Sequence, residues 1–298
     1  MVKFNPTMLE RPTTLSEAIS LLSKWGPQAR VVAGNTTLYE LAYQGGLADV
    51  DALIDIMNLG LSYVTVADDH VLRVGAATTF AEIGSSILLD KTSWYALKEV
   101  SLKMTPPQIR NMGTIGGAVC SGIPFYDLPV TLLALDAHFK TVSSTGERII
   151  KAEDFFVDYF VTALSAEDLL VEVQILKKPN TGSSFVKLGR TSVDFAVVNA
   201  STMISLDKKS RQISEARIAL GAVASTPIRA KDAEESLIGT ELSVGLLAKA
   251  AGVAAAADLE PLPSVHASSE YKKKVIPVIV RDALSIALRR AEEATYGK

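Results

Sequence analysis

Two short glycine-rich segments contain the residue types in this sequence that could bind a ligand through the backbone. They are Val31-Val32-Ala33-Gly34-Asn35-Thr36-Thr37-Leu38 and Asn111-Met112-Gly113-Thr114-Ile115-Gly116-Gly117-Ala118. Glycine lets a backbone approach a ligand closely, and consecutive N–H groups in such turns form concave anion sites. Neither segment carries a basic side chain like that of a P-loop. We therefore expect both loops to hold a diphosphate, mostly through main-chain donors.

The pairing of these segments matters more than either one alone. A single Gly/Thr-rich segment has the composition of an ordinary tight turn. Neither segment matches GxGxxG or GxxxxGK[ST], so a nucleotide bound on a doubly wound sheet is a poor fit. Each one follows an apolar stretch and lies near a predicted helix start. Together they favour a dinucleotide held between two loops.

The cysteine and histidine content limits other chemistry. Cys120 is the single cysteine, and the histidines are His70, His138 and His266. One cysteine excludes an internal disulfide and a thiolate-ligated iron–sulfur cluster, which needs about four protein ligands. The histidines show no metal-binding spacing, so we expect no zinc site. Redox chemistry in this chain would need an organic cofactor.

Composition narrows the class of protein further. The chain has 298 residues, 48% of them hydrophobic, and a formal net charge of −3. This length predicts two domains, and the absence of a basic stripe argues against nucleic-acid binding. The first residues lack the apolar region of a signal peptide, and no apolar run approaches the roughly 20 residues of a membrane span. We expect a soluble, cytoplasmic chain.

Hydrophobic periodicity predicts the elements that would position the two loops. A capping box is predicted at Thr79 to Glu82, and Asp127 is predicted to cap a helix. The segment from Met104 to Tyr126 shows no regular period and is expected to be irregular, while Lys272-Lys273-Lys274 is interpreted as a solvated helix face. Helices are predicted at 15–25, 38–44, 79–87, 93–100, 127–134, 244–257 and 268–295, and strands at 30–33, 51–56, 63–66, 71–76, 139–143, 169–176, 185–188, 196–204 and 213–223.

The domain boundary is placed in the polar, turn-rich segment 177–182. This division gives an N-terminal domain at 1–178, made of two α/β subdomains that split near 56–60, and a C-terminal domain at 179–298. The predicted fold class is α+β, with an antiparallel sheet and packed helices in the second domain.

Several motifs in their order resemble a known family. They are AGNTTL at Ala33 to Leu38, TIGG at Thr114 to Gly117, SGIPFYDLP at Ser121 to Pro129, FVKLGR at Phe185 to Arg190, TPIRA at Thr226 to Ala230, and SSEYKKK before the last helix. The sequence resembles the FAD-binding medium subunits of the xanthine dehydrogenase, carbon monoxide dehydrogenase and aldehyde dehydrogenase family of molybdenum hydroxylases. The resemblance covers nearly the whole chain.

The resemblance implies a two-subdomain FAD-binding domain of the vanillyl-alcohol-oxidase/CO-dehydrogenase flavoprotein type, with FAD bound non-covalently and no catalytic side chain. Asp127 would bind the adenosine side, and Phe195 would cover the isoalloxazine. Considered without the resemblance, Leu170 and Phe195 would be core residues and Lys187 a solvated strand residue. We expect Val at Gly34 or Gly116 to abolish flavin retention while leaving the fold largely intact. The implied FAD-binding residues are Val31, Val32, Ala33, Gly34, Asn35, Thr36, Thr37, Leu38, Met104, Thr114, Ile115, Gly116, Gly117, Ala118, Asp127, Leu170, Lys187 and Phe195.

The resemblance also implies partners. A small [2Fe-2S] subunit would relay single electrons from a large molybdopterin subunit, and the flavin would pass them to an external acceptor. The assembly would be a dimer of heterotrimers, and the single cysteine agrees with clusters on another chain. The substrate would bind to the molybdenum subunit, so aldehydes, purines, N-heterocycles and carbon monoxide all remain compatible with this sequence.

Two alternatives stay open at this point. A self-contained FAD-dependent oxidase or reductase of the same flavin-binding superfamily would need its own substrate pocket, often with a histidine attached to the flavin. No histidine lies in either glycine-rich segment. A non-catalytic assembly module without cofactor is the other alternative, and the glycines of both segments argue against it.

Overall fold

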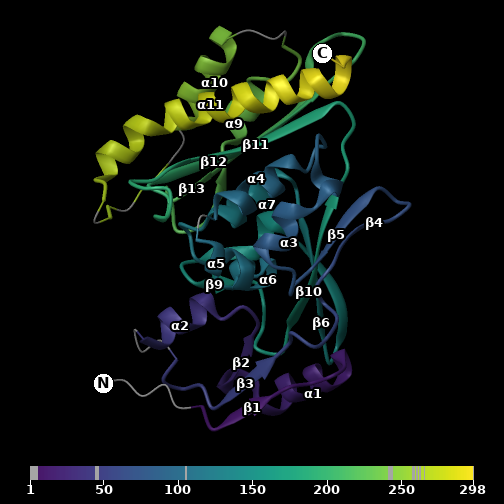
Figure 1. Ribbon diagram of the computed structural model, residues 1–298. Coiled ribbons are helices and arrows are strands. Elements are labelled where there is room, and N and C mark those ends of the chain that lie inside the picture. The colour runs from purple at the N-terminus through teal and green to yellow at the C-terminus, as the bar shows by residue number, and fades with distance from the viewer. Residues whose placement is uncertain are drawn as a thin grey trace.

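The computed structural model describes residues 6–43, 47–104, 106–240, 244–256, 259, 261, 263–264 and 266–297. Helices and strands are mixed in an α+β fold, as predicted, and the larger sheets follow one another along the molecule (Figure 1). Gln44 and Ala257, the predicted ends of two helices, lie outside the described residues. None of the described helices is long and apolar enough to cross a membrane.

A small parallel sheet forms the N-terminal end of the molecule. Its strand order is β1-β3-β2. The Thr14 hydroxyl accepts a hydrogen bond from the Glu17 amide and begins α1, which buries Ala18 and Leu22 against this sheet. Strand β2 leads through the first glycine-rich loop into α2. The elements are β1 (Met8–Glu10), α1 (Leu15–Trp25), a 3-10 turn (Gly26–Gln28), β2 (Ala29–Val32), α2 (Thr36–Tyr43) and β3 (Ala52–Asp55).

A five-stranded antiparallel sheet of order β4-β5-β10-β6-β7 occupies the middle of the molecule. Helices α3 to α7 surround a core centred on Trp94, Phe139 and Phe155. The elements are β4 (Val64–Val66), β5 (Val71–Gly75), α3 (Phe80–Ser85), a 3-10 turn (Ile87–Leu89), α4 (Tyr95–Lys103), α5 (Pro107–Met112), α6 (Ile115–Cys120), α7 (Asp127–Ala134), β6 (His138–Ser143), β7 (Gly146–Lys151), α8 (Ala152–Phe155), β8 (Phe156–Asp158), β9 (Val161–Thr162) and β10 (Leu169–Leu176).

The C-terminal antiparallel sheet has the order β11-β12-β13-β14. The long helix α11 packs on one face with α10 beside it, and α4 and α7 contact the opposite face, so the sheet is a middle layer (Figure 1). The elements are β11 (Thr181–Leu188), β12 (Val198–Leu206), β13 (Ile213–Gly221), β14 (Ile228–Arg229), α9 (Lys231–Glu235), α10 (Val244–Ala256) and α11 (Ser269–Tyr296).

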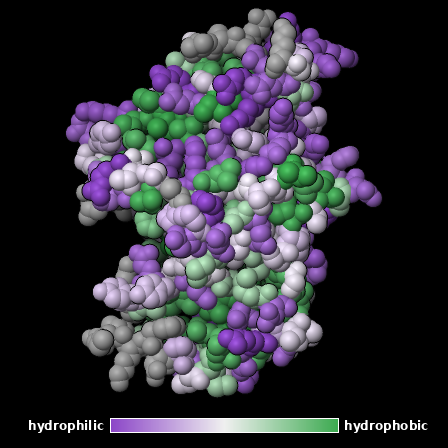
Figure 2. Space-filling view, in the orientation of Figure 1, coloured by the Kyte–Doolittle hydropathy of each residue, from purple (hydrophilic) through white to green (hydrophobic). Residues whose placement is uncertain are grey.

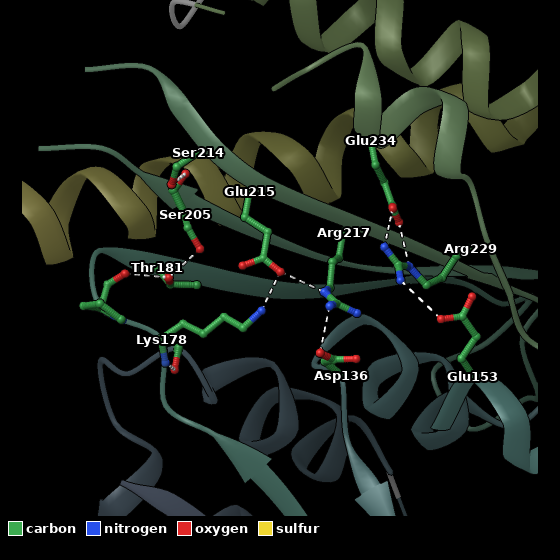
Figure 3. A network of polar contacts seen from close by, with 12 residues as sticks. Asp136, Glu153, Lys178, Thr181, Ser205, Ser214, Glu215, Arg217, Arg229 and Glu234 are labelled. Carbon is green, nitrogen blue, oxygen red and sulfur yellow. Dashed lines mark hydrogen bonds and ion pairs between the residues drawn. The ribbon is translucent and has the colours of Figure 1, made fainter. Parts of the chain in front are cut away.

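Ion pairs join this sheet to the middle of the molecule (Figure 3). Arg217 Nη2 on β13 lies 2.7 Å from Asp136 Oδ2, just before β6. Arg229 on β14 pairs with Glu234 and lies 3.7 Å from Glu153 Oε2 on α8. Because most of these side chains are largely buried, removing one partner would leave a poorly solvated charge. The pairs therefore fix how the C-terminal sheet sits on α7 and α8.

Several predictions about the elements are confirmed, and others are wrong. The Thr79–Glu82 capping box is complete, β4 pairs with β5 as a hairpin, and α11 spans nearly the predicted range. The segment predicted to be irregular contains α5 and α6, and α3 ends at Ser85 rather than continuing through Ile87. Lys272 is buried, whereas only its neighbours Lys273 and Lys274 are solvated.

Candidate functional site

A cavity of about 900 Å³ lies between the first glycine-rich loop, helices α5 and α6, the β8–β9 hairpin and the segment 192–195. This volume is at the upper end of the range for small-molecule sites. Figure 1 shows α2 below α5, α6 and β9 on the left, and the left edge of the surface is notched there in Figure 2. The predicted site residues that line the cavity are Val31, Val32, Ala33, Gly34, Asn35, Thr36, Thr37, Leu38, Met104, Thr114, Gly116, Gly117, Ala118, Asp127, Leu170, Lys187 and Phe195.

The first loop lines this cavity and has backbone donors without acceptors in the described chain. Asn35 has φ 59°, a left-handed conformation that asparagine tolerates better than most residues. It directly precedes α2, whose first N–H groups have no partner inside the helix. Within the described chain, no acceptor is found for the amides of residues 34–38. Because these amides and the helix dipole favour negative charge, the loop is suited to an anion.

The second loop differs in its hydrogen bonding. The amides of Ile115 and Gly116 donate to the carbonyls of Thr78 and Ala76, both at 2.9 Å. Gly117 N donates to Thr114 Oγ1 at 3.1 Å, and Ala118 N donates to the Thr114 carbonyl at 3.1 Å. The amides of residues 115–118 are therefore all bonded within the protein, so the second loop has fewer donors left for a ligand than the first. Ile115 does not line the cavity, because its side chain is fully buried in the core.

The glycines at 34 and 116 are needed for packing between segments. A Cβ on Gly34 would lie 1.8 Å from the Met112 carbonyl oxygen, which shows that the first loop packs directly against the start of the second. A Cβ on Gly116 would lie 2.6 Å from Ala76 O. Both distances are far below van der Waals contact with backbone atoms that cannot easily move. Val at either position would force backbone segments apart, so these distances argue against the expectation that the fold stays intact.

Asp127 belongs to a buried charged cluster. Its Oδ2 accepts a hydrogen bond from Lys187 Nζ at 2.8 Å, and its Oδ1 accepts one from Asn199 Nδ2 at 2.7 Å. The Asp127 and Lys187 side chains are only 8% and 11% exposed, respectively. Burial raises the pKa of the Asp127 carboxyl, and the adjacent Lys187 ammonium opposes that shift. The cluster thus holds a lysine ammonium at the cavity wall.

This arrangement corrects two sequence predictions. Asp127 does not cap α7: Tyr126 is at the N-cap position, no side chain caps the helix, and the Asp127 carboxylate instead reaches β11 and β12. Lys187 is also not a solvated strand residue. Sequence reasoning did not find Asn199, because a single Asn in an apolar strand gives no signal for its partner.

An aromatic group forms another part of the wall. Tyr126 and Phe195 stack with ring centroids 5.7 Å apart, and Phe125 packs edge-on against Phe195 at 5.0 Å. The Tyr126 hydroxyl is 2.8 Å from Thr37 Oγ1, which links this wall to the first loop. Phe195 is 51% exposed, so it is not a core residue, whereas Leu170 is buried. Sequence reasoning missed Phe125 and Tyr126, although the pair directly precedes Asp127 in the SGIPFYDLP motif.

Two further residues of the cavity, Lys103 and Cys120, have pKa values shifted by burial. Lys103 Nζ donates to the Phe185 carbonyl at 2.8 Å, and burial lowers the pKa of this lysine. Cys120 has solvent-accessible surface at the cavity but is enclosed by protein, and burial raises its thiol pKa to about 12. The thiol therefore stays protonated and is a poor nucleophile. Among the residues that the structure describes, no cluster of His, Cys, Asp and Glu could hold a metal ion.

The chain matches models of two protein families. The FAD binding domain in molybdopterin dehydrogenase matches residues 3–180, and the CO dehydrogenase flavoprotein C-terminal domain matches residues 183–287.

Individual relatives align over nearly their full length. The 6-hydroxypseudooxynicotine dehydrogenase complex subunit alpha of Paenarthrobacter nicotinovorans is 34% identical over 284 residues, 93% of each chain. The carbon monoxide dehydrogenase medium chain of Afipia carboxidovorans is 33% identical, covering 95% of this chain and 96% of that one. Reconstituted CO dehydrogenase from Oligotropha carboxidovorans contains a chain with a TM-score of 0.90 and 30% identity, covering 97% of this chain and 100% of that one. The chain belongs to the family of FAD-binding medium subunits of the molybdenum hydroxylases and is an oxidoreductase subunit.

Proposed function

We propose that the cavity binds FAD non-covalently, with its diphosphate at the amides of residues 34–38. The observation that carries this proposal is that residues 34–38 at the start of α2 line a cavity of about 900 Å³ and that their amides have no acceptor in the described chain. A diphosphate placed there gains main-chain hydrogen bonds and the favourable end of the helix dipole. The anion-binding role thus belongs mainly to the first loop.

The other cavity residues fit the remaining parts of FAD. Thr114, Gly116, Gly117 and Ala118 supply a close-packed wall beside the first loop. The apolar Leu170 and the exposed Phe195 ring offer surfaces against which a flat ring system would pack.

Charged residues complete the site. We propose that Asp127 faces the adenosine side through acceptor capacity left beyond its bonds to Lys187 and Asn199. The Lys187 ammonium, held by Asp127, adds a positive charge to the same wall. Met104 lines the same cavity. FAD itself supplies the ability to accept electrons singly and release them as a pair.

We propose that the electrons come from a small [2Fe-2S] subunit, which receives them from a large molybdopterin subunit, in a dimer of heterotrimers. The relatives named above are subunits of complexes, which supports this arrangement over a self-contained oxidase or reductase. Cys120 is the one cysteine of the chain, so the clusters would need ligands from another chain. The cytoplasmic location stays a prediction.

We also propose the domain division at 1–178 and 179–298, with the first domain split near 56–60. In support, β10 ends at Leu176 in the five-stranded sheet and β11 begins at Thr181 in the C-terminal sheet. Beside the first split, β3 ends at Asp55 in the parallel sheet and β4 begins at Val64 in the five-stranded sheet.

The substitution Asn35→Asp tests the proposed site. Aspartate also tolerates the left-handed conformation and suits a helix N-terminus, so the fold should be unaffected. Its carboxylate would repel a diphosphate at the adjacent amides, and we expect FAD affinity to fall about a hundredfold. The measurement is titration of the flavin-free chain with FAD, followed by absorbance and fluorescence.

Asn180→Asp is the matched control, because Asn180 is also left-handed, with φ 53°, and does not line the cavity. We expect this variant to bind FAD like the unmodified chain. Equal affinities for both variants would contradict the placement of the diphosphate. A chain that binds no FAD, alone or with its partner subunits, would contradict the proposed function as a whole.

A further inference from the structure

Helix α11 has a buried lysine, Lys272, in its first turn, which does not line the cavity. Lys272 is 6% exposed, although Lys273 and Lys274 beside it are exposed. Burial disfavours its charge, and so does its position near the positive end of the helix dipole. Burial also lowers the pKa of the lysine. Because both effects disfavour the Lys272 ammonium, its burial indicates a specific structural role.

The interaction that the structure shows for Lys272 is with a single carbonyl. Its Nζ donates to the Ala222 oxygen at 3.2 Å, and no carboxylate of the described chain pairs with it. Ala222 has φ 61°, a left-handed conformation that is unfavourable for a residue with a Cβ. The bend immediately after β13 is therefore strained and is held by a contact from a distant helix.

This bend contacts the segment that carries the aromatic wall of the cavity. The Ala222 amide donates to the Pro124 carbonyl at 3.1 Å, and Pro124 directly precedes Phe125 and Tyr126. Pro124 is buried, so its carbonyl has few other ways to be satisfied. The hydrogen bond at Ala222 thus holds the backbone from which Phe125 and Tyr126 extend into the wall.

The residue before the bend supports the charged cluster of the same cavity. A Cβ on Gly221 would lie 2.3 Å from Asn199 Oδ1, so glycine leaves the space in which the Asn199 amide sits. Asn199 in turn donates to Asp127, which holds Lys187. The end of β13 therefore contacts both the aromatic and the charged parts of the wall.

We propose that Lys272 is a positioning residue of the cofactor cavity, which fixes the Gly221–Ala222 bend and through it the Phe125–Tyr126 wall. The inference rests on the proposed function, because the cavity is taken to hold FAD. It gives helix α11 a role in the site, although this helix lies on the face of the C-terminal sheet opposite α4 and α7. Lys272 itself does not line the cavity.

The experiment compares three variants of the complete chain. Lys272→Met removes the donor, Lys272→Arg restores a charged donor, and Lys273→Met changes the exposed neighbour as the matched control. The first readout is amide hydrogen exchange of the flavin-free protein at Ala222 and over 121–126. The second is FAD affinity by titration. Thermal unfolding of each variant shows whether the fold is retained, and Lys272→Gln replaces Lys272→Met if the latter does not fold.

We expect Lys272→Met to speed exchange at Ala222 and in 121–126 and to weaken FAD binding about tenfold, the size of one lost hydrogen bond to a charged group. Arginine should restore both readouts, and Lys273→Met should change neither. Unchanged exchange in Lys272→Met, or faster exchange with unaltered FAD affinity, overturns the inference. If even the unmodified chain binds no FAD, the proposed function fails, while the exchange data still decide whether Lys272 holds the bend.

Discussion

The amides of residues 34–38, which line the cavity, have no acceptor in the described chain, whereas those of residues 115–118 are all hydrogen-bonded within the protein. The two segments are similar in composition, and both line the same cavity. Each segment begins a helix, but their surroundings differ. The first follows the edge strand β2 of the parallel sheet, whereas the second lies against residues 76–78, whose carbonyls accept two of its amides, and is capped by Thr114. A backbone amide can donate to a ligand only where no protein group already accepts its hydrogen bond.

The glycines of the two loops are present for two different physical reasons. Gly34 and Gly116 are required because another backbone lies against them. Gly117 faces the cavity, and a Cβ there would meet only Thr114 Oγ1 at 3.1 Å. Glycine in a binding motif therefore indicates close approach, but the approaching group can be the protein itself.

The largest effect is expected from Gly34→Ala. The added Cβ would lie 1.8 Å from Met112 O, so the two loops must separate, and we expect a loss of about 3 kcal/mol in the free energy of unfolding. The measurement is chemical unfolding of the flavin-free chain. Gly117→Ala is the control and should change stability by less than about 1 kcal/mol. Similar losses in both variants would remove the distinction between packing and cavity-facing glycines.

A smaller effect is expected from Thr114→Ala. The Thr114 hydroxyl caps α6 by accepting from Gly117 N, and losing such a cap costs about 1 kcal/mol of stability. The variant also frees the Gly117 amide beside the cavity. FAD affinity should therefore stay equal or rise while the unfolding free energy falls. A large loss of affinity without a loss of stability would show that Thr114 contacts the cofactor directly.

The smallest effect is expected from Thr37→Val. The Thr37 hydroxyl is hydrogen-bonded to Tyr126 at 2.8 Å, and one partly buried neutral hydrogen bond contributes about 0.5–1 kcal/mol. The substitution keeps the shape and the backbone amide at 37. FAD affinity should fall about threefold, measured by the same titration. Thr36→Val, which alters a hydroxyl with no partner in the described chain, should be closer to the unmodified protein.

Local sequence signals predicted the elements that depend on local interactions. The Thr79–Glu82 capping box, the β4–β5 hairpin and the long final helix follow from capping, turn and periodicity rules that span a few residues. Helices α5 and α6 were missed because each has six residues, too few to show a helical period among Gly and Pro. Helix α6 forms where surrounding segments bury it, whereas no residue of α5 is buried and Pro107 in its first turn favours its start.

The sequence by itself determined that the single cysteine cannot ligate an iron–sulfur cluster and to which family the chain is similar, and it predicted that two glycine-rich segments bind the cofactor. Only the tertiary structure decided that the first segment keeps its amides free, that Asp127 holds Lys187 instead of capping α7, and that Lys272 is buried. The physical reason is that composition fixes which donors and charges exist. Whether a donor is free, or a charge paired, depends on residues far away in sequence that the fold brings within a few ångströms.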